Sequence, residues 1–468
     1  MRYFSLIYLS FFSIIISVLS FFNIIYSYYF NLYLNLNCYI YTLLISLFLG
    51  FSFVFIKKDN SKVSIYQKIS IVVLGYLIFP LIISIPFYLS IYNISFLDSY
   101  FESISGFTST GFSIFDNIKH LDESLILWRS SSQWVGGLYF LFSLILLIDI
   151  FDESIKKSLT NFLSFNISET FKQTFKILIL YSLLTVIIFI ILKIFDFRTF
   201  DSFNLSMSLI SSGGFLPLND LSIAVNTNTK EIIFSLLMLF SFFSIFLSYN
   251  LIFFRKKNIN FFQEDFYLLG YLISLITIFF IFFNYNYNFS SVFLDLTSSV
   301  SNFGFSLAKT PESMSFLFLI LVIIGGSFFS TSSGIRFLKI FSLFKFSVNN
   351  LISHAKPKNI FLNKNPFFNI SFKDDDASKY FLSVMIFIIS LSCLSVFLTI
   401  SGISFEASFK LSILTIMNTV NSSMYGLGEF NFQGLPFITK IYLVFFMIIG
   451  RVELLTIFIF FKKYLFKN

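Results

Sequence analysis

Residues 101–112 of this chain read FESISGFTSTGF, a short amphipathic run that ends in hydroxyl side chains and a glycine. The same plan recurs as FNLSMSLISSGGF at 203–215 and as LDLTSSVSNFGF at 294–305. A looser copy, ILTIMNTVNSSMYGLG, occupies 413–428. The copies follow one another at intervals of about a hundred residues, which indicates one structural unit repeated four times.

The sequence around these copies is apolar enough to cross a membrane. Of the 468 residues, 56% are hydrophobic and only 12% are charged, whereas soluble domains carry about 25% charged residues. A membrane helix needs roughly 20 mostly apolar residues, and we expect about ten such helices, the first of them in place of a cleavable signal peptide. They are expected at residues 4–22, 39–56, 70–91, 125–151, 175–195, 232–254, 266–283, 315–337, 380–400 and 437–461.

Each copy of the repeated motif lies between two of these apolar stretches and is itself too short and too polar to span. The sequence therefore predicts an all-α polytopic membrane protein with two N-terminal helices and four pseudo-symmetric units of helix, re-entrant pore loop and helix. The expected divisions are 1–60 for the N-terminal helices, 61–155, 156–257 and 258–348 for the first three units (the third with a broken inner helix), 349–378 for a cytoplasmic loop and 379–468 for the fourth unit.

The distribution of charge predicts the orientation. Lys and Arg collect in cytoplasmic loops of membrane proteins. With the N-terminus placed in the cytoplasm, the expected inner loops hold most of the 32 basic residues, including Lys57, Lys58 and the segment 336–379. The net charge of +8 is thereby explained by topology, without a nucleic-acid partner.

Four re-entrant loops in one chain can surround a pore without oligomerisation. Irregular backbone at membrane depth is tolerated only against protein or a water-filled cavity, and a ring of carbonyl oxygens can replace the hydration shell of K⁺. Glycine accepts the dihedral angles that aim carbonyls at an axis. Glycine and serine also favour simple helix packing, which is the alternative for any single copy.

Four motifs together resemble the Trk/Ktr/HKT superfamily, which includes the membrane subunit of bacterial Trk potassium uptake. They are GFTSTG at 106–111, WRSSSQWVGG at 128–137, GGSFFSTSSGIR at 325–336 and GRVE at 450–453. The resemblance implies a homodimer with two pores in the bacterial cytoplasmic membrane. It also implies a cytoplasmic ring of TrkA-type subunits that would bind NAD or ATP and gate the pore.

The same resemblance implies a K⁺-binding filter and a gate. The filter residues would be Ser109, Thr110, Gly111, Ser212, Gly213, Phe303 and Gly304. A loop in the eighth span would lie below the filter as the gate; an alternative is a kinked helix without a moving part. The gate residues would be Gly325, Gly326, Ser327, Ser330, Thr331 and Gly334.

The fourth copy departs from the family pattern. Alignment on the glycines at 426 and 428 places Ser423 and Met424 in the filter, with Met424 where a glycine belongs, although Gly426 could serve in a shifted loop. In related plant proteins a non-glycine at a filter position accompanies sodium permeation. A less selective Na⁺/K⁺ permease therefore stays an alternative to K⁺ uptake.

Arg451 is an arginine deep within an apolar stretch. Such a charge is costly in a membrane and normally faces the protein interior or a cavity. Glu453 is two residues away and does not share its helix face. The resemblance implies that Arg451 is an electrostatic barrier in the pore; the alternative is pairing with a carbonyl or carboxylate of another helix.

Other functional classes have less support in the sequence. An ion-coupled secondary transporter usually keeps several ionisable groups at mid-membrane, and a membrane enzyme needs a cluster of them. Cys38 and Cys393 are the two cysteines, and the two histidines lie far apart, so we expect no catalytic residues and no cofactor on this chain. Trp128, Arg129 and Trp134 are expected to anchor the outer membrane interface.

Overall fold

The computed structural model is almost entirely helical and describes residues 6–54, 64–147, 170–252, 263–283, 288–307, 314–355, 374–427, 430–452 and 456. Its longer helices before the middle of the chain are α1 (Leu6–Tyr29), α2 (Leu36–Val54), α3 (Ile65–Leu89), α4 (Phe96–Phe107), α5 (Glu123–Leu146), α7 (Thr170–Ile194), α8 (Thr199–Ser211), α10 (Asn228–Phe242) and α11 (Ile245–Ile252). Those that follow are α12 (Gln263–Phe283), α13 (Phe289–Val300), α14 (Ser315–Ile323), α15 (Phe337–Ala355), α16 (Asp374–Ile400), α17 (Phe405–Ile416) and α18 (Phe437–Val452). Short elements are η2 (Ile118–His120), α9 (Leu221–Ala224), β1 (Ile324–Gly325), β2 (Ile335–Arg336) and η6 (Ser423–Tyr425).

The expected fold class is confirmed. Helices α4, α8, α13 and α17 have only 12, 13, 12 and 12 residues, too few to cross a bilayer. Each lies between two other helices of its own unit, as the repeat predicted, although α14, which follows α13, is interrupted after 9 residues. Neighbouring units meet where α5 packs on α8, α10 on α13, α14 on α17 and α18 on α4. The units therefore form a closed ring in chain order, in which the second faces the fourth.

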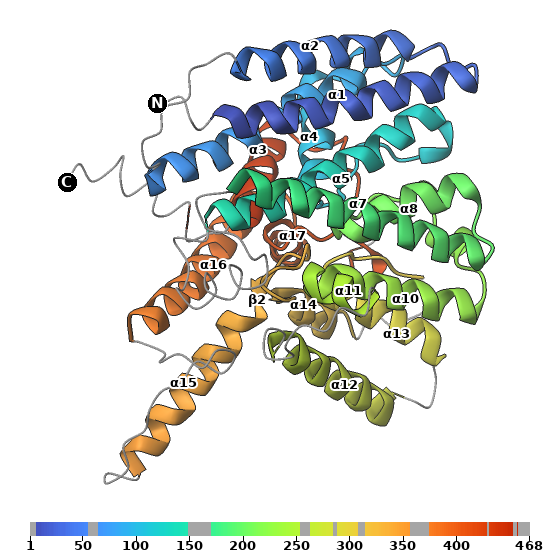
Figure 1. Cartoon of the computed structure of the whole chain (residues 1–468). Helices are drawn as coiled ribbons and strands as arrows, with labels where there is room; N and C mark the ends of the chain where they lie inside the picture. The colour runs from blue at the N-terminus through green and yellow to red at the C-terminus, as the bar shows by residue number, and fades with distance from the viewer. Residues whose placement is uncertain are drawn as a thin grey trace.

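The two N-terminal helices form an antiparallel pair beside this ring, at the upper edge of Figure 1. Serine hydroxyls on α1 donate to backbone carbonyls of α2, from Ser10 to Gly50 at 2.6 Å and from Ser13 to Ser46 at 2.7 Å. Small residues of this kind let membrane helices approach closely. The face of α1 toward the ring packs on α3 and α5.

Among the described residues, five helices are long and apolar enough to cross a membrane: Ile7–Tyr29, Ile65–Tyr88, Lys172–Ile194, Gln263–Ile281 and Asp376–Ile400. Two further expected spans are interrupted. The span at 232–254 is divided at Phe243 into α10 and α11, and the span at 315–337 is divided into α14, a loop and α15. Helix α15 then projects away from the other helices, at the lower left of Figure 1.

The two interruptions face each other and pair their backbone groups. The carbonyl of Phe242 accepts from the Ser327 amide at 3.0 Å, and the carbonyl of Ser241 accepts from the Ser332 amide at 3.0 Å. The Ile245 amide in turn donates to the Phe329 carbonyl at 3.2 Å. Broken helices persist in a membrane only where freed backbone groups find such partners.

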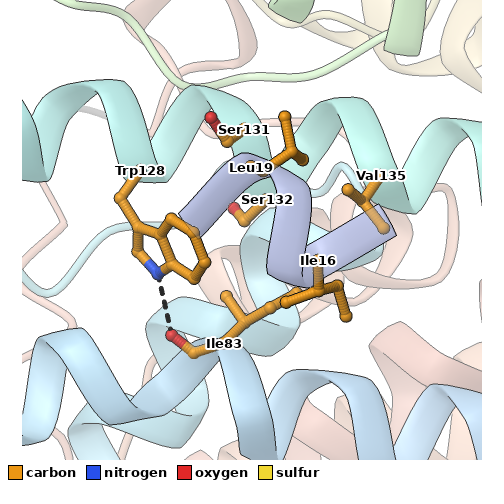
Figure 2. Close-up of a pocket in the computed structure, with 7 residues that line it drawn as sticks. All are labelled: Ile16, Leu19, Ile83, Trp128, Ser131, Ser132 and Val135. Atoms are coloured by element: carbon orange, nitrogen blue, oxygen red, sulfur yellow. Dashed lines mark hydrogen bonds between the residues drawn. The ribbon is translucent and has the colours of Figure 1, made fainter. Parts of the chain in front are cut away.

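The expectation that Trp128, Arg129 and Trp134 anchor the membrane interface is wrong, because all three are buried, with exposed fractions of 2%, 1% and 9%. The indole of Trp128 donates to the Ile83 carbonyl at 3.0 Å, as Figure 2 shows. The recess lined there by side chains of α1, α3 and α5 has no room for a water molecule. These residues bind helix α5 to the protein interior.

Candidate functional site

The four short helices end in a common turn that defines equivalent positions. In each unit an amide donates to the carbonyl five residues earlier, at 2.9 Å, and these pairs are Thr110 to Ser105, Gly213 to Ser208, Phe303 to Ser298 and Thr419 to Leu414. The residue before each donor has a left-handed backbone, with φ of 59° at Ser109, 55° at Ser212, 61° at Asn302 and 47° at Asn418. Serine and asparagine tolerate this conformation better than branched residues do.

The residue after each donor is therefore equivalent among the four loops. These residues are Gly111, Gly214, Gly304 and Val420. Gly111 and Gly304 have φ of +84° and +81°, which glycine adopts without strain. The first and third loops thus share one conformation, while Gly214 and Val420 do not take a left-handed φ.

This equivalence revises two of the residues expected in the filter. Gly213 corresponds to Thr110 and Phe303, and Gly214 takes the position of Gly111. In the fourth loop, Val420 takes that position in place of Met424, which lies four residues further along. Met424 is buried within η6, where its sulfur accepts from the Ser299 hydroxyl at 3.4 Å. Ser423 and Gly426 are exposed and lie outside the turn.

The four equivalent positions meet at one place. A β-carbon added to Gly111 would lie 2.5 Å from the α-carbon of Gly214. One added to Gly214 would lie 2.7 Å from the β-carbon of Val420, and one added to Gly304 would lie 2.3 Å from the Val420 carbonyl oxygen. Hydrogen bonds also join the loops, from the Ser212 hydroxyl to the Ser301 carbonyl at 2.6 Å and from the Asn418 amide to the Thr110 hydroxyl at 2.9 Å.

The first loop is supported from behind by a buried carboxylate that the sequence did not reveal. Glu102 accepts from the Ile114 amide at 2.9 Å and from the Arg129 guanidinium at 2.8 Å. Arg129 also donates to the Ser113 hydroxyl at 2.9 Å and lies 4.1 Å from the centroid of the Phe215 ring. Since Phe215 follows Gly214, this pair supports both loops. The one indication of this role in the sequence was that Glu102 is an acidic residue in the middle of a short amphipathic helix.

A further ion pair closes the ring between the fourth and first units. The Lys440 ammonium lies 2.5 Å from the Asp98 carboxylate and 2.8 Å from the Gln433 carbonyl. Nearby on α17, Lys410 lies 2.6 Å from Glu406, and this hydrogen bond holds the pKa of the Glu406 carboxyl below its usual value.

The residues expected to form the gate are folded back on themselves as one compact loop. Strands β1 and β2 pair in parallel, with Gly325 opposite Arg336. Arg336 donates to the carbonyls of Ser327 and Ser332 at 3.1 and 2.9 Å and to the Ser330 hydroxyl at 3.0 Å.

The gate loop is tied to two other parts of the fold. The Thr331 hydroxyl donates to the Ile210 carbonyl near the end of α8 at 2.7 Å. On the other side, Glu264 of α12 accepts from the Phe328 amide at 3.0 Å and from the Ser327 hydroxyl at 3.3 Å. Gly326 packs so closely on the Phe242 carbonyl that an added β-carbon would lie 2.3 Å from it.

Arg451 lies where the turns of the first and second units meet the loop that is expected to form the gate. Its guanidinium donates to the Ser333 hydroxyl of the gate loop, and at 3.4 Å both to the Ser109 hydroxyl and to the Ser211 carbonyl. It also lies 4.1 Å from the centroid of the Phe140 ring, and Arg336 lies 4.9 Å from the same centroid. Within the described ranges no carboxylate forms an ion pair with Arg451. Glu453 is outside those ranges.

The described residues include no group of three or more His, Cys, Asp and Glu side chains that could hold a metal ion. The ligands that the site does offer are backbone carbonyls and hydroxyls, which suit a monovalent cation rather than a transition metal.

No family model matches the chain. An uncharacterized cation transporter of Methanocaldococcus jannaschii is 25% identical over 457 residues, which cover 94% of this chain and 91% of that protein. The Trk system potassium uptake protein TrkH of Escherichia coli is 24% identical over 86% of this chain and 87% of its own, and TrkG of the same organism is 23% identical over 88% of each.

The fold is also similar to a solved structure. The crystal structure of the potassium transporter TrkH from Vibrio parahaemolyticus superimposes with a TM-score of 0.80 and 19% sequence identity, covering 98% of both chains. The resemblance that the motifs carried is thereby confirmed: the chain is a homologue of the TrkH and TrkG membrane proteins and has the TrkH fold.

Proposed function

We propose that this protein conducts potassium ions into the cell through the ring formed by Gly111, Gly214, Gly304 and Val420. The observation that carries the proposal is the common turn, which brings four copies of one loop together at the centre of a closed ring. The proposal requires that these loops present backbone carbonyls to the axis, since carbonyl oxygens can replace the water around K⁺. The bacterial relatives are named as potassium uptake proteins, which agrees with this chemistry.

Arg451 would act as the electrostatic barrier of this pathway. Its charge is buried, and its described partners are neutral, so a cation passing below the filter would meet an unbalanced positive charge. The loop of Gly325, Gly326, Ser327, Ser330, Thr331 and Gly334 would be the gate, because Ser333 connects it to Arg451. Opening would require this contact to break.

The remaining features of the proposal concern the assembly. We expect a homodimer in the bacterial cytoplasmic membrane with the N-terminus inside, and a TrkA-type ring that binds NAD or ATP as the gating partner. The chain itself would carry no catalytic residues and no cofactor. The basic segment between Arg336 and Lys379, part of which lies outside the described residues, would contact that ring or anionic lipid. The divisions of the chain at 60, 155, 257, 348 and 378 stay predictions.

Ion flux into proteoliposomes tests the proposal. Purified protein should take up K⁺ and Rb⁺ down a gradient, and Gly111→Arg should abolish this uptake because a side chain at that position would collide with the backbone of Gly214. Gly270→Ala is a matched control, since no atom lies within 4 Å of the added β-carbon. Uptake that survives Gly111→Arg would contradict the proposed pathway.

The second candidate function is a less selective Na⁺/K⁺ permease. The specific observation in its favour is Val420, which breaks the symmetry of an otherwise glycine-lined ring. Equal Na⁺ and K⁺ flux in the same vesicles would favour this alternative. An ion-coupled transporter would instead show flux that responds to an imposed proton or sodium gradient.

A further inference from the structure

Val420 is the one branched residue among the four equivalent ring positions and, like Gly214, does not take a left-handed φ. Gly111 and Gly304 use a left-handed φ, which a β-branched residue adopts only with strain. The fourth loop follows the common turn through Asn418 and Thr419 and then departs from it at Val420.

The backbone of Val420 pairs with the neighbouring loop. Its amide donates to the carbonyl of Phe303 at 3.3 Å, so an oxygen of the third loop is already hydrogen-bonded within the protein. Its own carbonyl oxygen lies against Gly304, 2.3 Å from where a β-carbon would be. The Phe303 carbonyl is therefore occupied by a contact between the third and fourth loops, and the Val420 carbonyl lies close to the backbone of Gly304.

The side chain of Val420 reaches across the ring. Its γ1 carbon lies 2.8 Å from the β-carbon position of Gly304, which belongs to the adjacent unit. Its β-carbon lies 2.7 Å from the β-carbon position of Gly214, which belongs to the second unit. Since the second unit faces the fourth in the ring, the isopropyl group fills space that the other three loops leave open with glycine.

We infer that Val420 is a fixed constriction of the cation pathway, which limits the flux of dehydrated alkali cations at the filter independently of Arg451 and the gate loop. This inference rests on the proposed function and adds to it a residue that sets the flux. An apolar group offers no oxygen to a cation that has lost its water, and it narrows the ring as well.

The test compares three variants of the purified protein in proteoliposomes under a K⁺ or Rb⁺ gradient. Val420→Gly should raise flux several-fold, and Val420→Ala should give a smaller rise because one methyl group remains. Met424→Gly is the matched control: it introduces the same residue four positions further along, outside the ring, and should give no rise. Flux of folded Val420→Gly at or below the wild-type level would overturn the inference, as would a rise confined to Met424→Gly.

A second measurement separates this inference from the proposed function. The midpoint of thermal unfolding is recorded in detergent with K⁺ or with N-methylglucamine, since an ion that binds the native state raises the midpoint. Val420→Gly should show a larger K⁺-dependent rise than wild type. Wild-type flux without a higher flux in Val420→Gly would reject the constriction and keep the proposed transport, whereas no flux in any of the proteins would reject the proposed transport itself. An identical K⁺ response in both proteins, together with equal flux, would reject the constriction.

Discussion

Glu102 and Arg129 form a buried ion pair directly behind the first filter loop, with 2.8 Å between Oε1 and Nε and exposed fractions of 0% and 1%. The carboxylate also holds the amide of Ile114, three residues after Gly111. Because two backbone segments and a second loop depend on this pair, its loss should affect both folding and ion passage.

Glu102→Ala should lower the free energy of unfolding by about 3–5 kcal/mol, since it leaves the Arg129 guanidinium buried without its carboxylate. Thermal or denaturant unfolding in detergent micelles measures the change. The control is Arg198→Ala, which removes an exposed ion pair to Glu123 with exposed fractions of 65% and 39%. That substitution should cost about 0–1 kcal/mol. Similar losses for the two variants would contradict a supporting role of Glu102.

Gly136→Ala should destabilise the junction of α5 with the end of α4. The added β-carbon would lie 1.9 Å from the Phe107 carbonyl oxygen, which is backbone and cannot move aside freely. Overpacking of this kind costs about 1–3 kcal/mol or more. Gly270→Ala on α12, with open space around the new carbon, should instead be neutral or stabilising by about 0.5–1 kcal/mol. The melting temperatures of the two variants should therefore shift in opposite directions or by clearly different amounts.

Arg451→Ala should raise ion flux, because it removes the buried positive charge from the pathway. A tenfold rise corresponds to about 1.4 kcal/mol taken from the barrier. Arg451→Lys keeps the charge but loses the guanidinium hydrogen bonds to Ser109 and Ser211. Its flux should therefore be close to that of the wild type. The electrostatic interpretation fails if both variants conduct equally, since shape rather than charge would then set the barrier.

Glu264→Ala should loosen the gate loop. The side chain of Glu264 accepts from the Phe328 amide and the Ser327 hydroxyl, and a hydrogen bond of this kind contributes about 0.5–1.5 kcal/mol. Amide hydrogen exchange across 327–334 should accelerate in this variant, while exchange in α17 stays unchanged. Glu264→Gln keeps an acceptor oxygen and should show a smaller effect. Unchanged exchange in Glu264→Ala would mean that the contacts of Arg336, Thr331 and the backbone of α10 hold the loop without Glu264.

The architecture could be predicted from the sequence because the same motif occurs in four copies. Four copies of one plan placed four short helices within the fold, and α4, α8, α13 and α17 occur in those places. The interruption at 325–334 was also visible, since small polar residues break an apolar run. The matching interruption at Phe243 was hidden, because Phe243 and Ser244 do not differ in composition from the residues of an intact helix.

The ring positions were predicted less completely, for two physical reasons. In the second copy Gly213 and Gly214 are adjacent, and only the hydrogen bond from Gly213 to Ser208 shows which of them follows the turn. In the fourth copy the ring position is Val420 instead of a glycine. Alignment of the motif on Gly426 therefore placed Met424 at the ring position. The better marker was the left-handed residue two positions earlier, a serine or asparagine in every copy.

The closed ring of four units within a single chain also has a genetic consequence. In a pore made of four identical subunits, one codon change alters every quarter at once. Here each quarter is encoded separately, so one position can be valine while Gly111, Gly214 and Gly304 are glycine. Valine and glycine codons differ by a single base, so a point mutation would give a ring of four glycines. Growth at limiting potassium could select for that mutation, and growth at high potassium could select against it.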